Sequence, residues 1–328
     1  MMWFPDNVNT VRMPAPSSVR ATISAPRRVF VMSFPLIKWV AGLSLAAAGV
    51  GVGSSFIPSS RLGRVVLLTA EDNIMTKLAE KVALVSGASR GIGKAIALAL
   101  AKEGASLYLV AEETEGELQA VCTDCEDRHD AVVAHYGVME LSEVDAGERM
   151  VEACLSQFGR VDILVNNAGV RRRANFGEYT QDDYEFTQAV NIRTPFFASQ
   201  AALPAMRQQG GGRIINITSQ MGSVAFDGLG LYGLTKAALI YLTKAISYDC
   251  ASDGIQANCV SPGPIATQYN IDRMKDDLEA WNKLEGGTTV GRFGKPEEVA
   301  EAVCFLATCE TTFIQGHDLI IDGGWTSH

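Results

Sequence analysis

The chain has 328 residues, of which 47% are hydrophobic and 20% are charged, and its formal net charge is -9. This composition excludes an intrinsically disordered protein, and the length allows one large α/β domain or two smaller ones. Residues 75–328 hold 21 Lys and Arg against 34 Asp and Glu, and so acidic a body argues against nucleic acid as a partner. The seven cysteines follow no regular spacing, which is typical of reduced thiols in an intracellular enzyme.

Residues 1–75 differ in composition from the rest of the chain. They are rich in Pro, Ser and Ala, contain scattered arginines, and hold no acidic residue between Asp6 and Glu71. This pattern is typical of a transit peptide, while the uncharged stretch 39–60 also fits a signal sequence or membrane anchor. A third interpretation is that the working chain starts at Met75. The alternatives predict an organellar, a membrane-anchored or a cytoplasmic protein, with membrane contact only if the segment is retained.

From residue 76 onward, short apolar runs alternate with longer helical patterns. The apolar runs predict buried strands at Val82–Ser86, Leu107–Val110, Val132–Ala134, Ile163–Val165, Ile214–Ile217 and Ile255–Val260. Helical patterns lie between them, for example at Ile92–Glu103 and Glu148–Phe158. Near-continuous apolar strands separated by helices predict a doubly wound parallel sheet, covered on both faces and joined by right-handed crossovers. Because no internal repeat or linker interrupts the pattern, we expect one α/β domain over residues 76–328.

The first predicted strand runs directly into a glycine-rich turn, "SGASRGIGK". Gly87, Gly91 and Gly93 follow the spacing G-x-x-x-G-x-G. Glycines at a strand-to-helix turn let backbone amides approach a pyrophosphate, whose negative charge the helix N-terminus favours. A purely structural turn is the alternative. The position after the first strand of a βαβ unit favours dinucleotide binding.

The stretch "LYGLTKAAL" places Tyr232 and Lys236 four residues apart. On a helix this spacing puts both side chains on one face. An ammonium beside a phenol lowers the pKa of the phenol from about 10, which makes a tyrosine a usable proton donor and acceptor. Such a pair also arises by chance on a solvated helix face, so the pair alone does not establish catalysis.

With these motifs, the chain resembles the classical short-chain dehydrogenase/reductase family, including its 3-oxoacyl carrier-protein reductases and its glucose- and gluconate-type dehydrogenases. The motifs, in that family's order and spacing, are the glycine turn Gly87–Gly93, "NNAG" at Asn166–Gly169, Asn191, Ser219, Tyr232 with Lys236, "SPGPIAT" at Ser261–Thr267 and "GHDLIIDGG" at Gly316–Gly324. The resemblance implies a Rossmann-type, three-layer domain with a small helical lid. It also implies an NAD(P)-dependent oxidoreductase that transfers hydride between nicotinamide and a secondary alcohol or ketone, such as a sugar, sugar acid, polyol or 3-oxoacyl thioester.

The resemblance further implies a catalytic tetrad. Tyr232 would be the general acid/base, and Lys236 would lower its pKa and bind the nicotinamide ribose. Ser219 would hydrogen-bond the substrate oxygen, and Asn191 would hold a water that links Lys236 to solvent. A non-catalytic nucleotide-binding scaffold or sensor is the alternative, but such relatives typically lack the tyrosine or the lysine.

The resemblance assigns the cofactor to residues of the same motifs. They are Gly87, Ser89, Arg90, Gly91, Ile92, Gly93, Glu112, Glu140, Asn167, Ala168, Gly169, Tyr232, Lys236, Pro262, Gly263, Ile265 and Thr267. Ala111 occupies the position of the family's ribose-binding acid, and Glu112 follows where many NADP-dependent members carry arginine. Glu112 would repel a 2′-phosphate, although Arg90 could contact one, so we expect NAD rather than NADP. Glu140 replaces an aspartate that usually bonds the adenine amine.

Two features bear on the substrate. The basic run Arg171–Arg173 borders the expected pocket entrance and could attract an acidic substrate, such as a sugar acid or the phosphopantetheine of an acyl carrier; a solvated basic turn is the alternative. In the lid expected after Gly263, apolar side chains at helical spacing favour packing over substrate contact. They are Met274, Leu278, Trp281 and Leu284.

A set of possible zinc ligands is present, but its spacing argues against a metal site. The set is Cys122, Cys125, His129 and His135. We interpret these residues as surface and turn positions, and no metal is expected. The resemblance also implies a homotetramer or homodimer, packed through the helices that contain Asn191 and Tyr232.

Overall fold

The computed structural model describes residues 76–112 and 115–327. The segment 1–75, with its targeting, anchoring and start-site interpretations, lies outside the described residues. Within the described ranges, no helix combines the length and the apolar character needed to cross a membrane.

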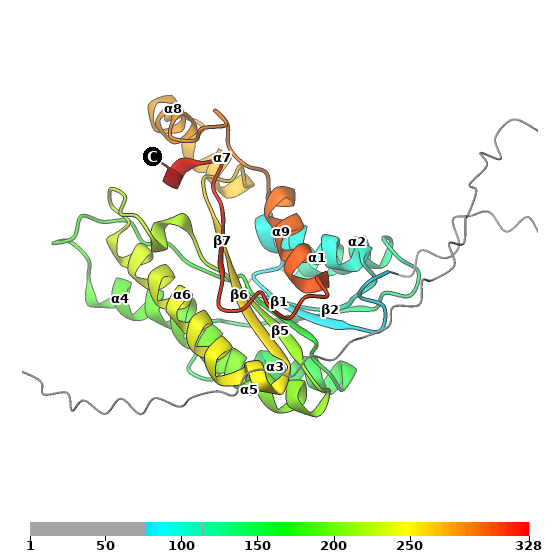
Figure 1. Ribbon diagram of the computed structural model, residues 1–328. Coiled ribbons are helices and arrows are strands. Elements are labelled where there is room, and N and C mark those ends of the chain that lie inside the picture. The colour runs from blue at the N-terminus through cyan, green and yellow to red at the C-terminus, as the bar shows by residue number, and fades with distance from the viewer. Residues whose placement is uncertain (1–75, 113–114, 328) are drawn as a thin grey trace, which may run out of the picture. The chain divides into compact units, whose positions relative to one another are not determined.

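A seven-stranded parallel sheet lies at the centre of the described part of the chain (Figure 1). Its strands are β1 (Val82–Ser86), β2 (Ser106–Ala111), β3 (Ala134–Val138), β4 (Ile163–Asn166), β5 (Gly212–Ile217), β6 (Ile255–Pro262) and β7 (Asp318–Ile321). Their order across the sheet is β3-β2-β1-β4-β5-β6-β7. The connections reverse direction between β1 and β4, which opens a crevice at the carboxyl ends of the strands. The doubly wound fold expected from the sequence is therefore confirmed.

Helices cover both faces of the sheet (Figure 1). On one face lie α1 (Gly91–Lys102), α2 (Glu115–Glu126) and α9 (Pro296–Thr308). On the other lie α3 (Ala146–Phe158), α5 (Thr194–Gln208) and α6 (Gly230–Cys250). Helix α4 (Gln181–Gln188) leads through a π-helical turn at Ala189–Arg193 into α5, and the short helices α7 (Gln268–Met274) and α8 (Leu278–Gly286) follow β6 as the lid.

Burial explains why the central strands are readable from the sequence. Every residue of β1, β4 and β6 is buried, because helices cover both faces of these strands. Such strands need continuous apolar runs, which the sequence shows. Small side chains let α1 approach the sheet and α9 closely: Ala95, Ala97 and Ala101 are all buried.

The two edge strands differ from the sequence-based expectation. The apolar run predicts a strand at Val132–Ala134, whereas β3 begins at Ala134 and ends at Val138. The sequence pattern predicts no strand at β7. Only one of five residues in β3 and none of four in β7 is buried. An edge strand has less apolar surface to cover: His135 and Tyr136 interrupt the apolar pattern of β3, and the apolar run of β7, Leu319–Ile321, lies between Asp318 and Asp322.

Cys122 and Cys125 are buried on α2, which corrects their assignment to surface or turn positions. Together with Leu118 and Val121 they follow the i, i+3, i+4, i+7 spacing of a buried helix face. Desolvation raises the pKa of Cys122 to about 11 and that of Cys125 to about 12. These thiols therefore serve as core side chains. Among the residues with a described position, no group of three or more His, Cys, Asp or Glu could hold a metal ion.

Candidate active site

Two cavities adjoin at the carboxyl ends of the central strands, and Asn167 and Gly169 line both. The first measures about 240 Å³ and is lined by these predicted site residues: Ile92, Asn167, Gly169, Ser219, Tyr232, Lys236, Pro262, Gly263, Ile265 and Thr267. The second measures about 310 Å³ and is lined by Gly87, Ser89, Arg90, Glu112, Asn167, Ala168 and Gly169. Four predicted residues, Gly91, Gly93, Glu140 and Asn191, line neither cavity. The fold thus gathers most of the predicted site into one continuous crevice.

The glycine turn is packed against the loop that follows β4. Gly87 has a positive φ of 65°, and the Asn167 side-chain amide donates to the carbonyl oxygens of Ser86 and Gly87, each at 3.0 Å. A Cβ on Gly93 would lie 2.0 Å from the Gly87 carbonyl oxygen, so only glycine fits there. Gly93 is therefore required for close packing of α1 on the turn, and it does not line the cavity.

The N-terminus of α1 fits an anionic group. Arg90 is the N-cap residue, its side chain makes no capping hydrogen bond, and the first turn contains no acidic residue. The first N–H groups of a helix have no partners within the helix and carry partial positive charge. Because Ser89 and Arg90 line the second cavity, this end of the crevice suits the pyrophosphate of a dinucleotide.

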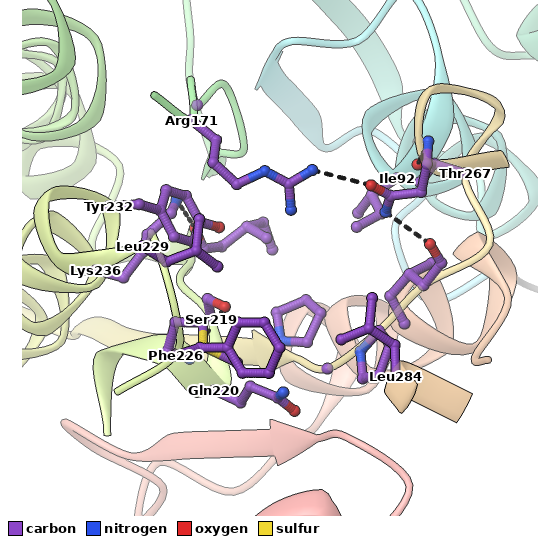
Figure 2. A pocket seen from close by; sticks show the side chains of 18 of the residues that line it. Ile92, Arg171, Ser219, Gln220, Phe226, Leu229, Tyr232, Lys236, Thr267 and Leu284 are labelled. Carbon is purple, nitrogen blue, oxygen red and sulfur yellow. Dashed lines mark hydrogen bonds between the residues drawn. The ribbon is translucent and has the colours of Figure 1, made fainter. Parts of the chain in front are cut away.

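Tyr232 and Lys236 lie one turn apart on α6 and both line the first cavity (Figure 2). The Lys236 ammonium donates to the Ile217 carbonyl oxygen at 2.8 Å and lies 5.6 Å from the centre of the Tyr232 ring. Ser219 follows β5 directly, and its hydroxyl accepts a hydrogen bond from the Met221 N–H at 3.2 Å. The Ser219 side chain lies near enough to Tyr232 to lower the pKa of its phenol. Two hydroxyl groups and one ammonium therefore converge on the cavity.

Desolvation is the largest influence on the pKa values of Tyr232 and Lys236. It raises the pKa of Tyr232 above its usual range, against the hydrogen bond from Ser219 and the positive charge of Arg171, which lower it. It lowers the pKa of Lys236 to about 8. The expected lowering of the Tyr232 pKa by Lys236 is not found in this structure. The Lys236 ammonium is bonded to Ile217, and the burial of the phenol outweighs the nearby charge.

Asn191 lies on the π-helical turn between α4 and α5 and is fully buried. Its side-chain oxygen accepts from the Val170 N–H at 2.8 Å, and its amide donates to the Val170 carbonyl at 2.9 Å and to the Thr235 hydroxyl at 3.0 Å. A Cβ on Gly169 would lie 3.3 Å from Lys236 Nζ and 3.5 Å from Asn191 Oδ1. Asn191 thus fixes the backbone beside Lys236, with no contact to the cavity.

At the far end of the second cavity, Glu112 lies with Ala111, Ser89 and Arg90. Glu140 is not among the residues that line this cavity, and its carboxylate accepts hydrogen bonds from the Ser142 N–H at 3.0 Å and the Ser142 hydroxyl at 2.6 Å. The pKa of Glu140 is lowered, mainly by a hydrogen bond that it shares with the Glu112 carboxyl group and to a smaller extent by the hydrogen bonds from Ser142. The role of Glu140 at the adenine therefore stays a prediction.

Several lining residues escape the motif-based prediction. Gln220 immediately follows Ser219, and Arg273 and Asn270 come from α7. The basic run is split, since Arg171 and Arg173 line the first cavity but Arg172 does not. The only sequence signals are the place of Gln220 beside Ser219 and the place of Arg273 in the expected lid.

The apolar stripe of the lid divides between two roles. Trp281 stacks on Phe293 with ring centres 4.1 Å apart, as packing predicts. Met274 and Leu284 line the first cavity, whereas Leu278 is 71% exposed. The prediction that the stripe serves mainly for packing is therefore correct for Trp281 only.

Comparisons with known proteins agree with this geometry. A family model described as enoyl-(acyl carrier protein) reductase matches residues 87–326. Gluconate 5-dehydrogenase of Gluconobacter oxydans (strain 621H) is 36% identical over 244 residues, which cover 74% of this chain and 94% of the relative. The structure of a short-chain dehydrogenase/reductase from Serratia marcescens is 37% identical, with a TM-score of 0.71 over 76% of this chain and 99% of that one. A blue fluorescent protein from a metagenomic library, solved in complex with NADPH, is 36% identical, with the same TM-score and coverage.

Proposed function

The chain belongs to the classical short-chain dehydrogenase/reductase family, and from that premise we propose that Tyr232 exchanges the proton while hydride passes between NAD(P) and a secondary alcohol or ketone. The observation that carries the proposal is the meeting of Ser219, Tyr232 and Lys236 in one cavity, beside a second cavity at the glycine turn. When bound, the nicotinamide ring accepts or releases the hydride.

Tyr232 and Ser219 present two hydroxyl groups to the same cavity. A carbonyl oxygen placed between them would accept two hydrogen bonds, which stabilise negative charge that develops on it. Because desolvation raises the pKa of Tyr232, the phenol holds its proton at neutral pH and can donate it during reduction. Oxidation requires the reverse transfer, from the alcohol to a phenolate.

Lys236 would supply the positive charge that a Tyr232 phenolate needs. Its ammonium lies 5.6 Å from the tyrosine ring in a buried environment, where charges interact more strongly than in water. Asn191 would support this arrangement indirectly, because it fixes the Val170 backbone and the Thr235 hydroxyl beside Lys236. Asn191 is thus a positioning residue.

We further propose that NAD is preferred over NADP. Glu112 lies in the second cavity and shares a hydrogen bond with Glu140, and the negative charge that this pair of carboxyl groups retains would repel a 2′-phosphate. Arg90 in the same cavity favours the phosphate, and the relative solved with NADPH shows that the fold accommodates it. The preference therefore depends on the balance between these two side chains.

The proposed role of Tyr232 is tested with the full-length chain and the Tyr232→Phe variant. Turnover is followed by absorbance of the reduced nicotinamide, with NAD and NADP against sugars, sugar acids, polyols, cyclic alcohols and 3-oxoacyl thioesters. The variant should bind cofactor normally and lose at least about 10²-fold in turnover, because general acid–base catalysis contributes about that much. Tyr241→Phe, which removes an exposed hydroxyl from the same helix, is the matched control. Undiminished turnover by Tyr232→Phe would refute the proposal.

A further inference from the structure

We propose that the substrate carries an anionic group, a carboxylate or a phosphate, a few bonds from its reacting carbon, and that Arg171, Arg173 and Arg273 bind this group. The proposal rests on the proposed function, because it takes the cavity of Tyr232 and Ser219 as the substrate pocket. It adds a ligand class and a binding subsite to that function.

The charge of the cavity wall is the first observation. The described residues that line the first cavity include Arg171, Arg173, Arg273 and Lys236 but no aspartate or glutamate. The chain as a whole carries a net charge of -9, so this local excess of positive charge opposes the overall balance. A concave site of one sign raises the local concentration of ligands of the opposite sign.

The three arginines also have no ion-pair partner among residues 76–112 and 115–327. Arg171 donates to the Asn270 side-chain oxygen at 3.0 Å, and Arg173 donates to the Asp227 main-chain carbonyl at 3.1 Å. Arg273 makes no hydrogen bond or ion pair with any residue in the described ranges. A guanidinium has five N–H donors, so each of the three retains donors for a ligand.

Arg273 is close enough to the other two for repulsion. Its pKa is lowered by desolvation and then by the charges of Arg171 and Arg173, while Asp277 acts weakly in the opposite direction. An anion held among the three guanidinium groups would remove this repulsion. Arginine pairs with carboxylate and phosphate through two parallel hydrogen bonds, which fixes the orientation of the bound group.

Arg172 provides the contrast within the same basic run. Its guanidinium lies 3.8 Å from the Asp183 carboxylate and 4.8 Å from the centre of the Phe186 ring, and it does not line the first cavity. A solvated basic turn would give its three arginines similar surroundings. Arg172 instead lines a neighbouring cavity of about 450 Å³, which shares Arg171 and Tyr232 with the first, so the basic run is divided between two adjoining spaces.

Gln220 gives an independent indication of a polar ligand. Its side chain lines the same cavity and is only 2% exposed, and its Oε1 atom has no hydrogen-bond partner among the described residues. A buried acceptor without a donor is unfavourable, and a ligand hydroxyl that donated to it would remove this penalty. In Figure 2, Arg171 and Gln220 extend from opposite sides of the cavity, with Ser219 and Tyr232 along one wall.

The size of the cavity limits where the charge can sit. The arginines line the same volume of about 240 Å³ as Tyr232, so the anionic group and the reacting carbon belong to one small molecule. A carrier-bound thioester instead holds its phosphate at the far end of a phosphopantetheine arm, many bonds from the reacting carbon. A hydroxy or keto acid, or a small phosphorylated alcohol, therefore fits better than a carrier-bound thioester.

The proposal is tested by the binding of matched probes to the full-length protein loaded with reduced cofactor, a state in which an alcohol cannot react. Calorimetry compares 3-hydroxybutyrate with butan-2-ol, gluconate with glucitol, and glycerol 3-phosphate with glycerol. In at least one pair, the anion should bind at least about tenfold more tightly, as expected for hydrogen bonds to a charged group. The first two pairs report a carboxylate and the third a phosphate.

Arg273→Gln and Arg173→Gln should each weaken binding of the anion by about tenfold or more and leave the neutral partner unchanged. Arg128→Gln is the control and should alter neither affinity, because Arg128 is exposed and lines neither this cavity nor the neighbouring one. Both tested arginines are exposed at the cavity rim, and thermal unfolding verifies the fold of each variant. Equal binding within every pair, no binding of any anion, or an unchanged anion affinity in Arg273→Gln would overturn the proposal. So would tighter binding of an uncharged acetoacetyl thioester of N-acetylcysteamine than of every anion.

Failure of the proposed function would look different. The same alcohols, offered with oxidised cofactor, would then produce no reduced nicotinamide, although the anions still bound and still depended on Arg273. Turnover of neutral alcohols without any effect of Arg273→Gln would instead support the proposed function and reject the anion subsite.

Discussion

At the Tyr232–Lys236 pair, burial acts on both side chains toward their neutral forms. It raises the pKa of the phenol and lowers that of the ammonium to about 8. A protein that only needed stability would not bury a lysine against a single carbonyl, because removing an ammonium from water is unfavourable. The arrangement is therefore consistent with a site where charge is required for chemistry.

The Lys236 pKa predicts a pH-dependent stability difference. Since the folded state holds this proton less tightly than the unfolded chain, the buried lysine destabilises the fold below pH 8, and this effect fades as pH rises toward 10.5. The variant Lys236→Met lacks this contribution. The unfolding free energy of the wild type, relative to the variant, should therefore rise by up to about 3 kcal/mol over that pH range. Urea unfolding at several pH values measures the difference.

Lys244→Met serves as the control, because it removes an exposed lysine from the same helix. If the difference in unfolding free energy between wild type and Lys236→Met stayed constant from neutral pH to pH 10.5, Lys236 would not be desolvated. The comparison does not depend on the hydrogen bond to Ile217, whose loss in Lys236→Met shifts the variant's stability equally at every pH.

If Glu112 disfavours NADP, reversing the charge at this position should shift the cofactor preference toward NADP. Glu112→Arg replaces repulsion of a 2′-phosphate by attraction, and it places a second arginine near Arg90. The ratio of kcat/KM for NADP to that for NAD should rise at least about tenfold, as expected for one charge-assisted contact. Steady-state kinetics with both cofactors measures this ratio.

Glu115→Arg makes the same charge change at a residue that does not line the cavity, and should move the ratio little. A wild-type enzyme that prefers NADP, or a ratio that Glu112→Arg leaves unchanged, would contradict the proposed role of Glu112.

Which site residues can be read from the sequence depends on how they are positioned. The glycine turn, Ser219, Tyr232 and Lys236 follow directly from strand ends and helical spacing, and the fold brings Ser219, Tyr232 and Lys236 into one cavity. Gln220 and Arg273 carry no such signal, because their relevance depends on side-chain direction and on how the lid helix packs. Spacing along the chain does not encode either.

At the scale of elements, the turn between β1 and α1 is packed so closely that adding one methyl group at Gly93 should destabilise the fold. Gly93→Ala would place Cβ 2.0 Å from the Gly87 carbonyl oxygen and 2.6 Å from the Asn167 amide nitrogen. The turn must then move away from the loop after β4. We expect a loss of about 1–3 kcal/mol in unfolding free energy, as for other overpacked sites, together with weaker cofactor binding. Chemical unfolding and cofactor titration measure the two effects.

Gly116→Ala is the matched control, since Gly116 lies in the first turn of α2 and an added Cβ there meets no atom within 4 Å. Alanine also favours a helix over glycine, so this variant should not lose stability. Equal stability and cofactor affinity of Gly93→Ala and wild type would show that the turn has room to adjust.

The sequence predicts some helices and strands more clearly than others, and the more clearly predicted ones are more deeply buried. Strand β1, covered on both faces, is apolar apart from Ser86, and β6 is mainly apolar or small although it buries Gln256 and Asn258; the apolar pattern predicts both close to their bounds. Strands β3 and β7 lie at the two edges of the sheet and carry Tyr136, His135 and Asp318. Their polar residues conceal them in a search for apolar runs.

At the scale of the whole molecule, α6 carries an exposed apolar stripe. Leu234, Tyr241 and Tyr248 are 54%, 74% and 91% exposed and lie seven residues apart, which places them along one helix face. Phe196 on the neighbouring α5 is 43% exposed. Contiguous apolar surface of this kind marks an interaction site, and a two-fold axis would pair the stripe with its own copy.

A second exposed apolar pair, Phe305 on α9 and Phe313 before β7, lies outside this stripe. A tetramer with three perpendicular two-fold axes needs more than one self-complementary surface, whereas a dimer needs only one. The two patches therefore favour a homotetramer over a homodimer. Light scattering should give the mass of four chains of 35.2 kDa each.

Charge placed in the stripe tests this assembly. Tyr241→Glu puts carboxylates against each other across the two-fold axis, where a desolvated charge without a partner is strongly unfavourable. The variant should therefore sediment as a dimer held by the second patch. Val144→Glu, at a residue 74% exposed outside both patches, should remain tetrameric. A monomeric wild type would refute the assembly, and a tetrameric Tyr241→Glu would show that α6 faces solvent within it.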